Sequence, residues 1–100
     1  MMWFEWDNGN ISKILARFDL HEVEKFFLQE LLVIEDDLHS EKEKRFIAVG
    51  NGPEKKPMFV CFTVRAGKIR VISARLMREK EAKKYEKFKK NIKEKEKVGK

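Results

Sequence analysis

Three β-type segments separated by short turns constrain the fold of this chain more than any other feature. Phe, Val, Ile and Thr are concentrated in residues 44–49, 57–64 and 68–74, with turn-forming residues at 51–53 and 66–67. These segments predict a meander of three strands. Side chains alternate along a strand, and both faces of the 57–64 segment are largely apolar. We therefore expect both faces of the sheet to be covered.

Two short amphipathic helices are predicted before the meander. Apolar residues from Ile11 to Phe18 recur at spacings of three and four, and Asn10 is the expected cap of this helix. Asp19 lies three residues before Glu22, which is the spacing of a capping box. It begins a second helix whose apolar face continues toward residue 31.

Three further elements are predicted outside these segments. Residues 3–7 predict a short first strand, and residues 32–34 predict another strand, for which a helix end is the alternative on period alone. From about residue 79, apolar side chains at Tyr85, Phe88 and Ile92 return to helical spacing. The sequence therefore predicts a terminal helix.

The order of these elements predicts an α+β fold. It consists of a small antiparallel sheet, a meander, packed with two N-terminal helices and one C-terminal helix. The length of 100 residues matches one domain. We place that domain at residues 1–92 and expect the basic tail 93–100, which lacks an apolar stripe, to fray.

Charge is distributed unevenly along the chain. Residues 1–44 carry 5 Lys/Arg against 11 Asp/Glu, residues 45–75 carry 7 against 1, and residues 76–100 carry 11 against 5. A basic surface built from the second half would attract a polyanion such as nucleic acid. The alternative is a solvated surface rich in Lys and Glu, as in heat-adapted proteins.

Membrane insertion and secretion are not predicted. The longest apolar run, Met58 to Phe62, is far shorter than the roughly 20 residues that span a bilayer. No signal-peptide pattern opens the chain, and the lone Cys61 cannot form an internal disulfide. The expected location is the cytoplasm.

Familiar catalytic motifs are absent from the sequence. It has no Gly-rich phosphate loop, no nucleophile elbow and no His/Cys metal spacing, so no cofactor or metal is predicted. We interpret His21 as an exposed helical residue, His39 as a loop residue and Cys61 as a buried structural thiol.

Three arginines in the predicted strands are the best candidates for a binding site. Arg45, Arg70 and Arg75 could bind phosphate oxygens through paired donors. The alternative is surface ion pairing with the acidic residues Asp36, Asp37, Glu41 or Glu43. Arg70 and Arg75 are five residues apart and converge on one face only if a bulge redirects one of them.

The sequence resembles the BrnT-type ribonuclease toxins of bacterial and archaeal type II toxin–antitoxin modules. The matching pieces, which cover roughly residues 3 to 86, are Phe4-Glu5-Trp6-Asp7, Asn10-Ile11 with Lys13, Glu22-Val23-Glu24 leading to Phe27, the segment 43–50, and Ile69-Arg70-Val71-Ile72-Ser73-Ala74-Arg75 with Glu81 and Tyr85. The most specific of these pieces is Arg-Val-Ile-Ser-Ala-Arg followed by Glu and Tyr.

This resemblance implies a RelE-like fold and an endoribonuclease that suppresses translation. It also implies a cognate antitoxin with a ribbon-helix-helix DNA-binding part, so that DNA is a partner only through the antitoxin. Two positions depart from the family pattern. Phe18, after Arg17, replaces a His found in many relatives, and Arg78 replaces a Thr at the start of the last helix.

Our leading hypothesis is a metal-independent RNase toxin. Arg45, Arg70 and Arg75 would stabilise negative charge at the reacting phosphate, with Glu43 as the candidate base. Lys13, Arg17 and Tyr85 are the candidate RNA-binding residues, and for Lys13 and Arg17 the alternative is a solvated helix face. The rival hypotheses are a non-catalytic RNA-binding or protein-interaction module that has lost activity, and a structural domain whose basic last helix binds an acidic protein.

Overall fold

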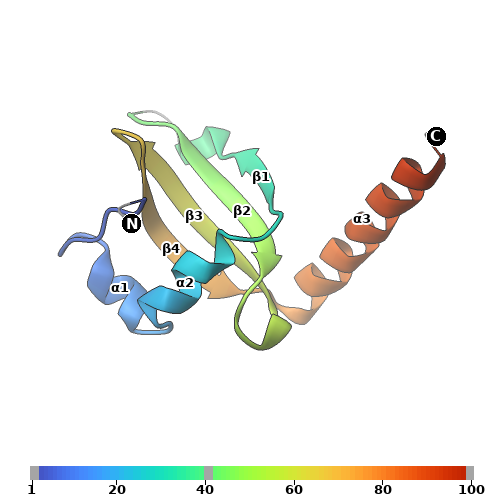
Figure 1. The fold of residues 1–100 in the computed structure, drawn as a ribbon, viewed down its shortest axis with the longest axis horizontal. Coiled ribbons are helices and arrows are strands. Elements are labelled where there is room, and N and C mark those ends of the chain that lie inside the picture. Colours follow the sequence, from blue (N-terminus) through green and yellow to red (C-terminus); the bar gives the residue numbers. More distant parts are fainter. Residues whose placement is uncertain (1–2, 40–41, 99–100) are drawn as a thin grey trace.

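A computed structural model describes the backbone of residues 3–39 and 42–98 and the side chains of residues 3–38 and 42–91. Its four strands are β1 (Leu32–Glu35), β2 (Arg45–Asn51), β3 (Pro57–Arg65) and β4 (Lys68–Leu76). They form one antiparallel sheet in the order β1-β2-β3-β4 (Figure 1). The predicted meander and the short strand at 32–34 are therefore confirmed.

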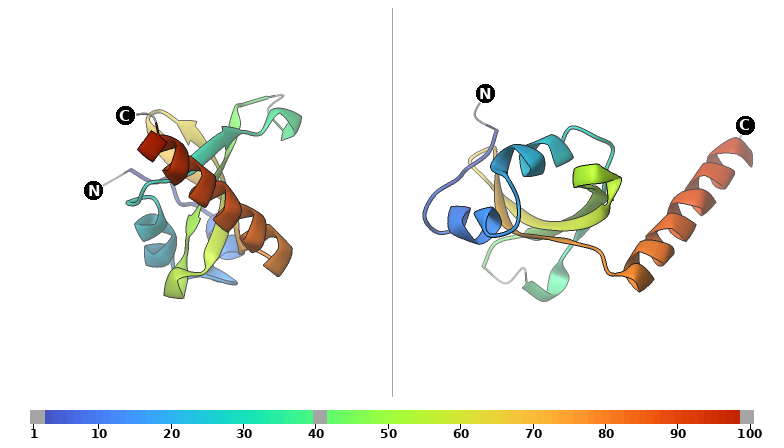
Figure 2. Two further views of the ribbon diagram at one scale, coloured as in Figure 1. Left: turned by 90° about the vertical axis from the view of Figure 1, so that its right-hand side faces the viewer. Right: turned by 90° about the horizontal axis from the view of Figure 1, so that it is seen from below.

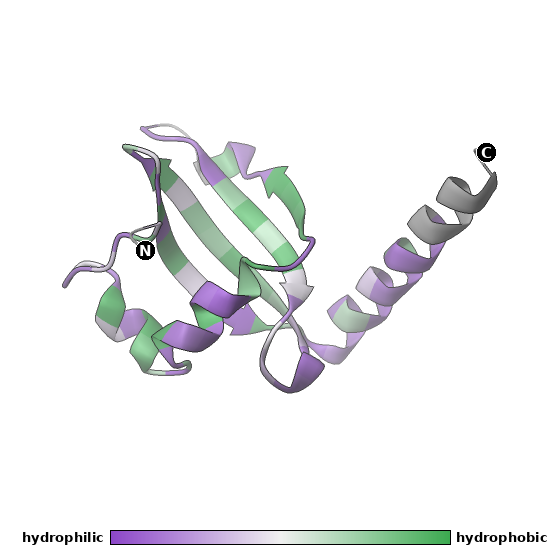
Figure 3. Ribbon diagram, in the orientation of Figure 1, coloured by the Kyte–Doolittle hydropathy of each residue, from purple (hydrophilic) through white to green (hydrophobic). Residues whose placement is uncertain are grey.

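Two short helices, α1 (Ile11–Leu15) and α2 (Leu20–Phe26), pack against one face of the sheet (Figures 1 and 2). We call it the helix face. The predicted capping box is confirmed, because Asp19 accepts a hydrogen bond from the His21 backbone and Glu22 accepts one from the Asp19 backbone. Hydrophobic residues, green in Figure 3, occur along both helices and the strands. Their side chains form the core on this face, including Ile14, Phe18, Val23, Phe26, Met58, Val60, Phe62 and Val71.

The opposite face of the sheet, which we call the second face, is built from the alternate residues. One row across the sheet pairs Val49 with Phe59 and Phe59 with Arg75, and the next row pairs Ile47 with Cys61 and Cys61 with Ser73. Neither α1 nor α2 covers this face, and Phe59 and Cys61 are only half-buried. The prediction that both faces are covered is wrong, because alternation fixes which side chains share a face and not what lies above them.

The predicted first strand at 3–7 is also wrong, since only a single parallel bridge joins Phe4 to Ile69. The physical reason is the side chain of Asn10. Its amide donates to the Val71 carbonyl at 2.9 Å, and its oxygen accepts from the Asp7 backbone N–H at 2.9 Å. Asn10 thus occupies the place of the next strand pair. It is the N-cap residue of α1, as predicted, but its side chain makes no capping hydrogen bond.

The terminal helix α3 (Glu79–Val98) confirms the predicted C-terminal element and extends away from the sheet (Figures 1 and 2). Two short 3-10 helices, η1 (Asp37–His39) and η2 (Pro53–Lys55), lie in the connections. The domain boundary at 92 and the fraying of 93–100 stay predictions, and residues 99–100 lie outside the described chain. No helix in the described ranges is long and apolar enough to cross a membrane.

Candidate nucleic-acid interface

A groove of about 590 Å³ opens on the second face beside α1. We call it the cationic groove. Three cations stand around it, namely Lys13, Arg17 and Arg75, and its apolar floor consists of Ile34, Ile47, Val49, Phe59 and Cys61. Ala16, Ser73 and Ala74 are also in the lining, and none of its described residues is a carboxylate. The volume falls in the range of roughly 300 to 1,000 Å³ that is typical of ligand sites.

Arg75 is the most firmly held cation of the groove. Its two terminal nitrogens donate to the two carboxylate oxygens of Glu81, each at 2.9 Å, and its guanidinium lies 4.8 Å from the centre of the Phe59 ring. These contacts use one edge and one face of the guanidinium. No hydrogen bond between described residues uses its Nε, so the other edge can offer paired donors to a phosphate.

Glu81 is the residue that fixes Arg75, and it also serves the start of α3. Its Oε1 accepts a hydrogen bond of 2.8 Å from the Arg78 backbone N–H. The bonds from Arg75, followed by this one from Arg78, lower the pKa of Glu81 from an ordinary 4.5 to about 2. The carboxylate is therefore ionised at neutral pH, and it holds Arg75 in a single orientation.

Lys13 and Arg17 are four residues apart on α1 and in the turn that follows it. Both side chains are exposed, and neither forms an ion pair within the described parts of the chain. The packing of α1 against β4 brings them to the same groove as Arg75. The structure thus unites three of the predicted site residues.

Arg70 lies at the other end of the second face and is tied to the N-terminal segment. It donates to Glu5 at 2.9 Å and to both carboxylate oxygens of Asp7 at 2.8 and 3.0 Å, and only 13% of its side chain is exposed. The Arg70 hydrogen bonds lower the pKa of Asp7. A Cβ at Gly9 would come within 2.7 Å of the Arg70 guanidinium, so glycine leaves room for the arginine in its present position.

Glu43 and Arg45 are also placed at this far end. Glu43 accepts two hydrogen bonds of 3.0 Å from Arg65, which lower the pKa of its carboxyl group. A lowered pKa makes a carboxylate a weaker base. Arg45 lies opposite Thr63 in the register, and Thr63 lies opposite Arg70.

A β-bulge decides how Arg70 and Arg75 are related. The register of β3 and β4 shifts between Cys61 and Phe62, whose partners are Ser73 and Val71, and Ile72 is the extra residue. Both arginines therefore lie on the second face. Their partners Thr63 and Phe59 are four residues apart on β3, which separates the two arginines by about 13 Å.

The remaining candidates lie outside the groove. Phe18 is buried in the core with 9% of its surface exposed, so it contributes to packing at the position where the resemblance expects His. Tyr85 lies on α3, where burial raises its pKa and the Lys89 ammonium lies 5.2 Å from its ring centre. His21 is exposed on α2, and the side chain of His39 lies outside the described residues.

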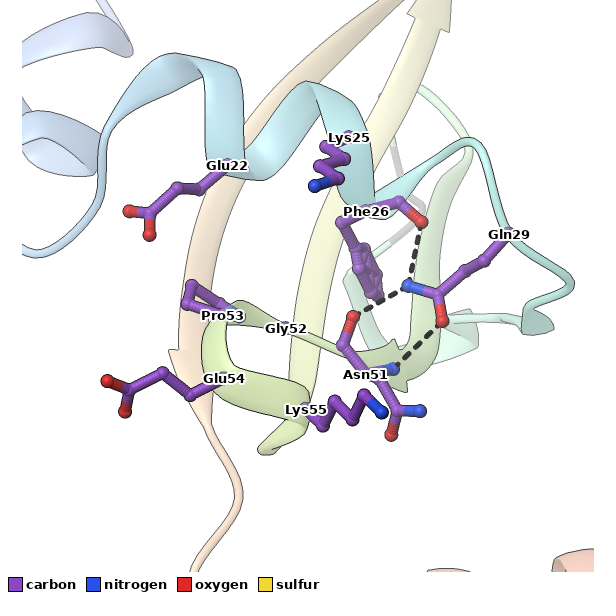
Figure 4. A pocket seen from close by; sticks show the side chains of 9 residues that line it. All are labelled: Glu22, Lys25, Phe26, Gln29, Asn51, Gly52, Pro53, Glu54 and Lys55. Atoms are coloured by element: carbon purple, nitrogen blue, oxygen red, sulfur yellow. Dashed lines mark hydrogen bonds between the residues drawn. The ribbon is translucent and has the colours of Figure 1, made fainter.

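A second hollow of about 510 Å³ lies between α2 and the connection from β2 to β3 (Figure 4). Its lining mixes acidic and basic side chains, including Glu22, Lys25, Glu54 and Lys55. Gln29 closes one side by exchanging two hydrogen bonds with the Asn51 backbone at 2.6 and 3.2 Å. These bonds join the end of α2 to the end of β2, so Gln29 has a structural role.

Sequence reasoning missed the floor of the groove and the role of Glu81. The alternation along β3 predicted that Phe59 and Cys61 share one face of the sheet. Because we expected that face to be covered, we did not consider either residue for a binding site. Glu81 follows Arg75 by six residues, a spacing that corresponds to no contact within a strand or a helix. The two side chains meet only because the chain turns between β4 and α3. Among the described residues, no three His, Cys, Asp or Glu side chains lie close enough together to hold a metal.

Comparison with known protein families shows to which family this chain is related. The model for "Ribonuclease toxin, BrnT, of type II toxin-antitoxin system" matches residues 6–81. The chain belongs to the BrnT family. Searches of curated proteins and of solved structures found no match, so the likeness to RelE-type toxins stays a prediction. The range matched to BrnT includes all three groove cations and ends at Glu81.

Membership of the BrnT family assigns a class of function to this chain. The family consists of ribonuclease toxins of type II toxin–antitoxin systems, so the protein is a toxin of this class with an antitoxin as its partner. The cationic groove, where three cations meet, is our candidate surface for a ribonuclease role.

Proposed function

We propose that this BrnT protein is an endoribonuclease that cleaves RNA at the cationic groove and thereby inhibits translation. The observation that carries the proposal is the convergence of Lys13, Arg17 and Arg75 around one groove, in which no described lining residue is acidic. Such a groove attracts phosphate groups, because Lys13 and Arg17 have no ion-pair partner among the described residues and only Arg75 is paired, with Glu81.

The chemistry we propose is attack of an RNA 2′-hydroxyl on the neighbouring phosphorus. The new bond forms between the 2′-oxygen and phosphorus, and the bond from phosphorus to the 5′-oxygen of the next nucleotide breaks. Negative charge develops on the phosphate oxygens, where the free edge of Arg75 would donate paired hydrogen bonds. Because Glu81 already fixes Arg75, little reorganisation is needed during the reaction.

The proton must pass from the 2′-hydroxyl to the departing 5′-oxygen. Of the three groove cations, only Lys13 can lose and regain a proton, because a guanidinium remains charged. We therefore assign proton handling to Lys13 and phosphate binding to Arg17. Glu43, the base expected from the sequence, lies at the far end with Arg65, which makes it the weaker candidate.

Arg45 and Arg70 receive different roles in this proposal. Arg70 fixes the N-terminal segment through Glu5 and Asp7, and so supports the position of α1. Arg45 is proposed to contact the RNA strand as it leaves the groove across the second face. Tyr85, on α3, is proposed to contact RNA outside the groove.

The antitoxin is proposed to be a ribbon-helix-helix protein that covers the cationic groove. A surface of this charge predicts that the covering part of the antitoxin is acidic. DNA would then be bound only through the antitoxin.

One observation favours a second candidate function, a module that binds RNA without cleaving it. Phe18 occupies the position of the family His, lies in the core and offers no group for proton transfer. Under this alternative the cationic groove binds RNA, and the rates of RNA degradation with and without the protein are equal.

A cleavage assay with the purified full chain separates the two functions. A 5′-labelled single-stranded RNA is incubated with the wild type, with a Lys13→Ala/Arg17→Ala/Arg75→Ala variant and with the control Arg65→Ala. We expect fragments with the wild type and the control and none with the triple variant. RNA that is bound but stays intact with the wild type would favour the non-catalytic module.

A further inference from the structure

The floor of the cationic groove has a property that phosphate binding does not use. Its apolar side chains come from three strands in two adjacent rows, with Val49 beside Phe59 and Ile34 beside Ile47 and Cys61. A phosphate group gains nothing from such a floor, because it is fully hydrophilic. A ligand that uses both the cations and the floor must carry an anionic part and an apolar part.

We propose that the cationic groove binds one unpaired nucleobase of single-stranded RNA, and that Phe59 is the residue that positions it. This inference rests on the proposed function and names its substrate class. A nucleotide combines the two required parts, since its phosphate is anionic and its base has a flat apolar face. In an RNA duplex the bases are paired and stacked, so they cannot reach the floor.

Phe59 acts through the layered arrangement that it forms with Arg75. The guanidinium lies 4.8 Å from the ring centre and is held in place by Glu81. A fixed guanidinium plane and an aromatic ring are the two surfaces on which proteins stack unpaired bases. Phe59 therefore fixes the level of Arg75 above the sheet and supplies part of the apolar surface beneath the base.

The remaining polar groups of the groove can read the edge of a bound base. Ser73 lies in the row of Cys61 and is the one hydroxyl among the described residues of the lining. A hydroxyl both donates and accepts a hydrogen bond, so it can meet the edge of any base. We therefore expect a modest preference among bases and a strong preference for unpaired over paired RNA.

The test measures binding with RNA that cannot be cleaved. Hexamers of 2′-O-methyl RNA lack the attacking hydroxyl, and a series is made in which a single abasic residue moves along the strand. The proteins are the wild type, Phe59→Leu and the matched control Phe88→Leu, which makes the same change on an exposed part of α3. Affinity is measured by fluorescence anisotropy at one fixed salt concentration.

For the wild type and Phe88→Leu, we expect one abasic position to weaken binding by about 5- to 150-fold, the range for loss of a stacked base. For Phe59→Leu, the intact hexamer should bind more weakly and the same abasic position should matter much less. A base-paired hairpin should bind more weakly than the intact hexamer. Equal binding of all abasic hexamers by the wild type, a matter of RNA alone and not of any variant's folding, would overturn the inference.

Cleavage of unmodified RNA by the same wild-type preparation separates this inference from the proposed function. If RNA is cleaved and no abasic position matters, the nucleobase site is wrong and the ribonuclease function stands. If one abasic position matters and RNA is not cleaved, the ribonuclease function is wrong and the nucleobase site stands. Absence of binding to every hexamer would overturn the nucleobase site.

Discussion

Glu81 accepts two hydrogen bonds of 2.9 Å from Arg75 and so joins the first turn of α3 to the end of β4. The same contact orients the guanidinium at the cationic groove. In the proposed function, stability and RNA cleavage both depend on this one ion pair, so the pair can be tested through either property.

The first prediction concerns the pH dependence of stability. The pKa of Glu81 is about 2 in the folded chain and 4.5 ordinarily, so its contribution is complete above about pH 4.5 and is lost as the pH falls toward 2. Glu81→Gln should remove this part of the pH dependence. Chemical denaturation between pH 2 and 7 measures it, with the exposed Glu30→Gln as the control. Equal curves for wild type and Glu81→Gln would show that the ion pair does not contribute.

The second prediction assigns Arg70 to structure. Arg70→Ala leaves Glu5 and Asp7 without their shared partner and should lower the free energy of unfolding by about 1 to 3 kcal/mol. At a temperature where the variant is folded, its RNA cleavage should remain close to that of the wild type. Thermal melting followed by a cleavage assay tests both parts. A stable Arg70→Ala protein with strongly reduced cleavage would return Arg70 to the site.

The third prediction concerns salt. Three groove cations that contact phosphates of single-stranded RNA give a slope of about −2 when log affinity is plotted against log salt concentration. Arg17→Ala should reduce the slope by about 0.7, because one phosphate contact is lost. Filter binding across a salt series measures this change, and an unchanged slope would remove Arg17 from the RNA contact.

The fourth prediction concerns the departure from the family pattern at residue 18. Phe18 is buried in the core, so Phe18→His places a polar ring among apolar side chains and should destabilise the protein by about 1 to 3 kcal/mol. Because the side chain faces the core, cleavage should not become faster. A gain in cleavage rate without a change in RNA affinity would instead identify position 18 with proton transfer.

Local patterns predicted much of this fold, and contacts distant in sequence account for what they did not predict. The strands of the meander and the Asp19 capping box depend on neighbouring residues, which a sequence displays directly. The failed first strand depends on Asn10 and Val71, which are 61 residues apart. No local pattern reveals that one side chain will take the place of a backbone partner.

The candidate site was predicted only in part, again because contacts between residues distant in sequence determine it. The sequence indicated Lys13, Arg17 and Arg75 as cations, and the packing of α1 against β4 united them. Arg70 looked equivalent to Arg75 in sequence, yet the register places it about 13 Å from Arg75 and beside Asp7, which is 63 residues away in sequence. Both arginines are held by carboxylates, so what distinguishes them is their place along the second face, which the sequence does not show until the strand register is known.

The most direct test of the central claim compares two arginine variants in a single-turnover cleavage assay. We expect Arg75→Ala to lower the cleavage rate by about a hundredfold or more, as loss of a preorganised donor does elsewhere, with only a modest loss of RNA affinity. Arg65→Ala, which removes an arginine from the far end of the second face, should leave the rate within a fewfold of the wild type. Equal rates for Arg75→Ala and the wild type would contradict the assignment of the cationic groove as the site of RNA cleavage.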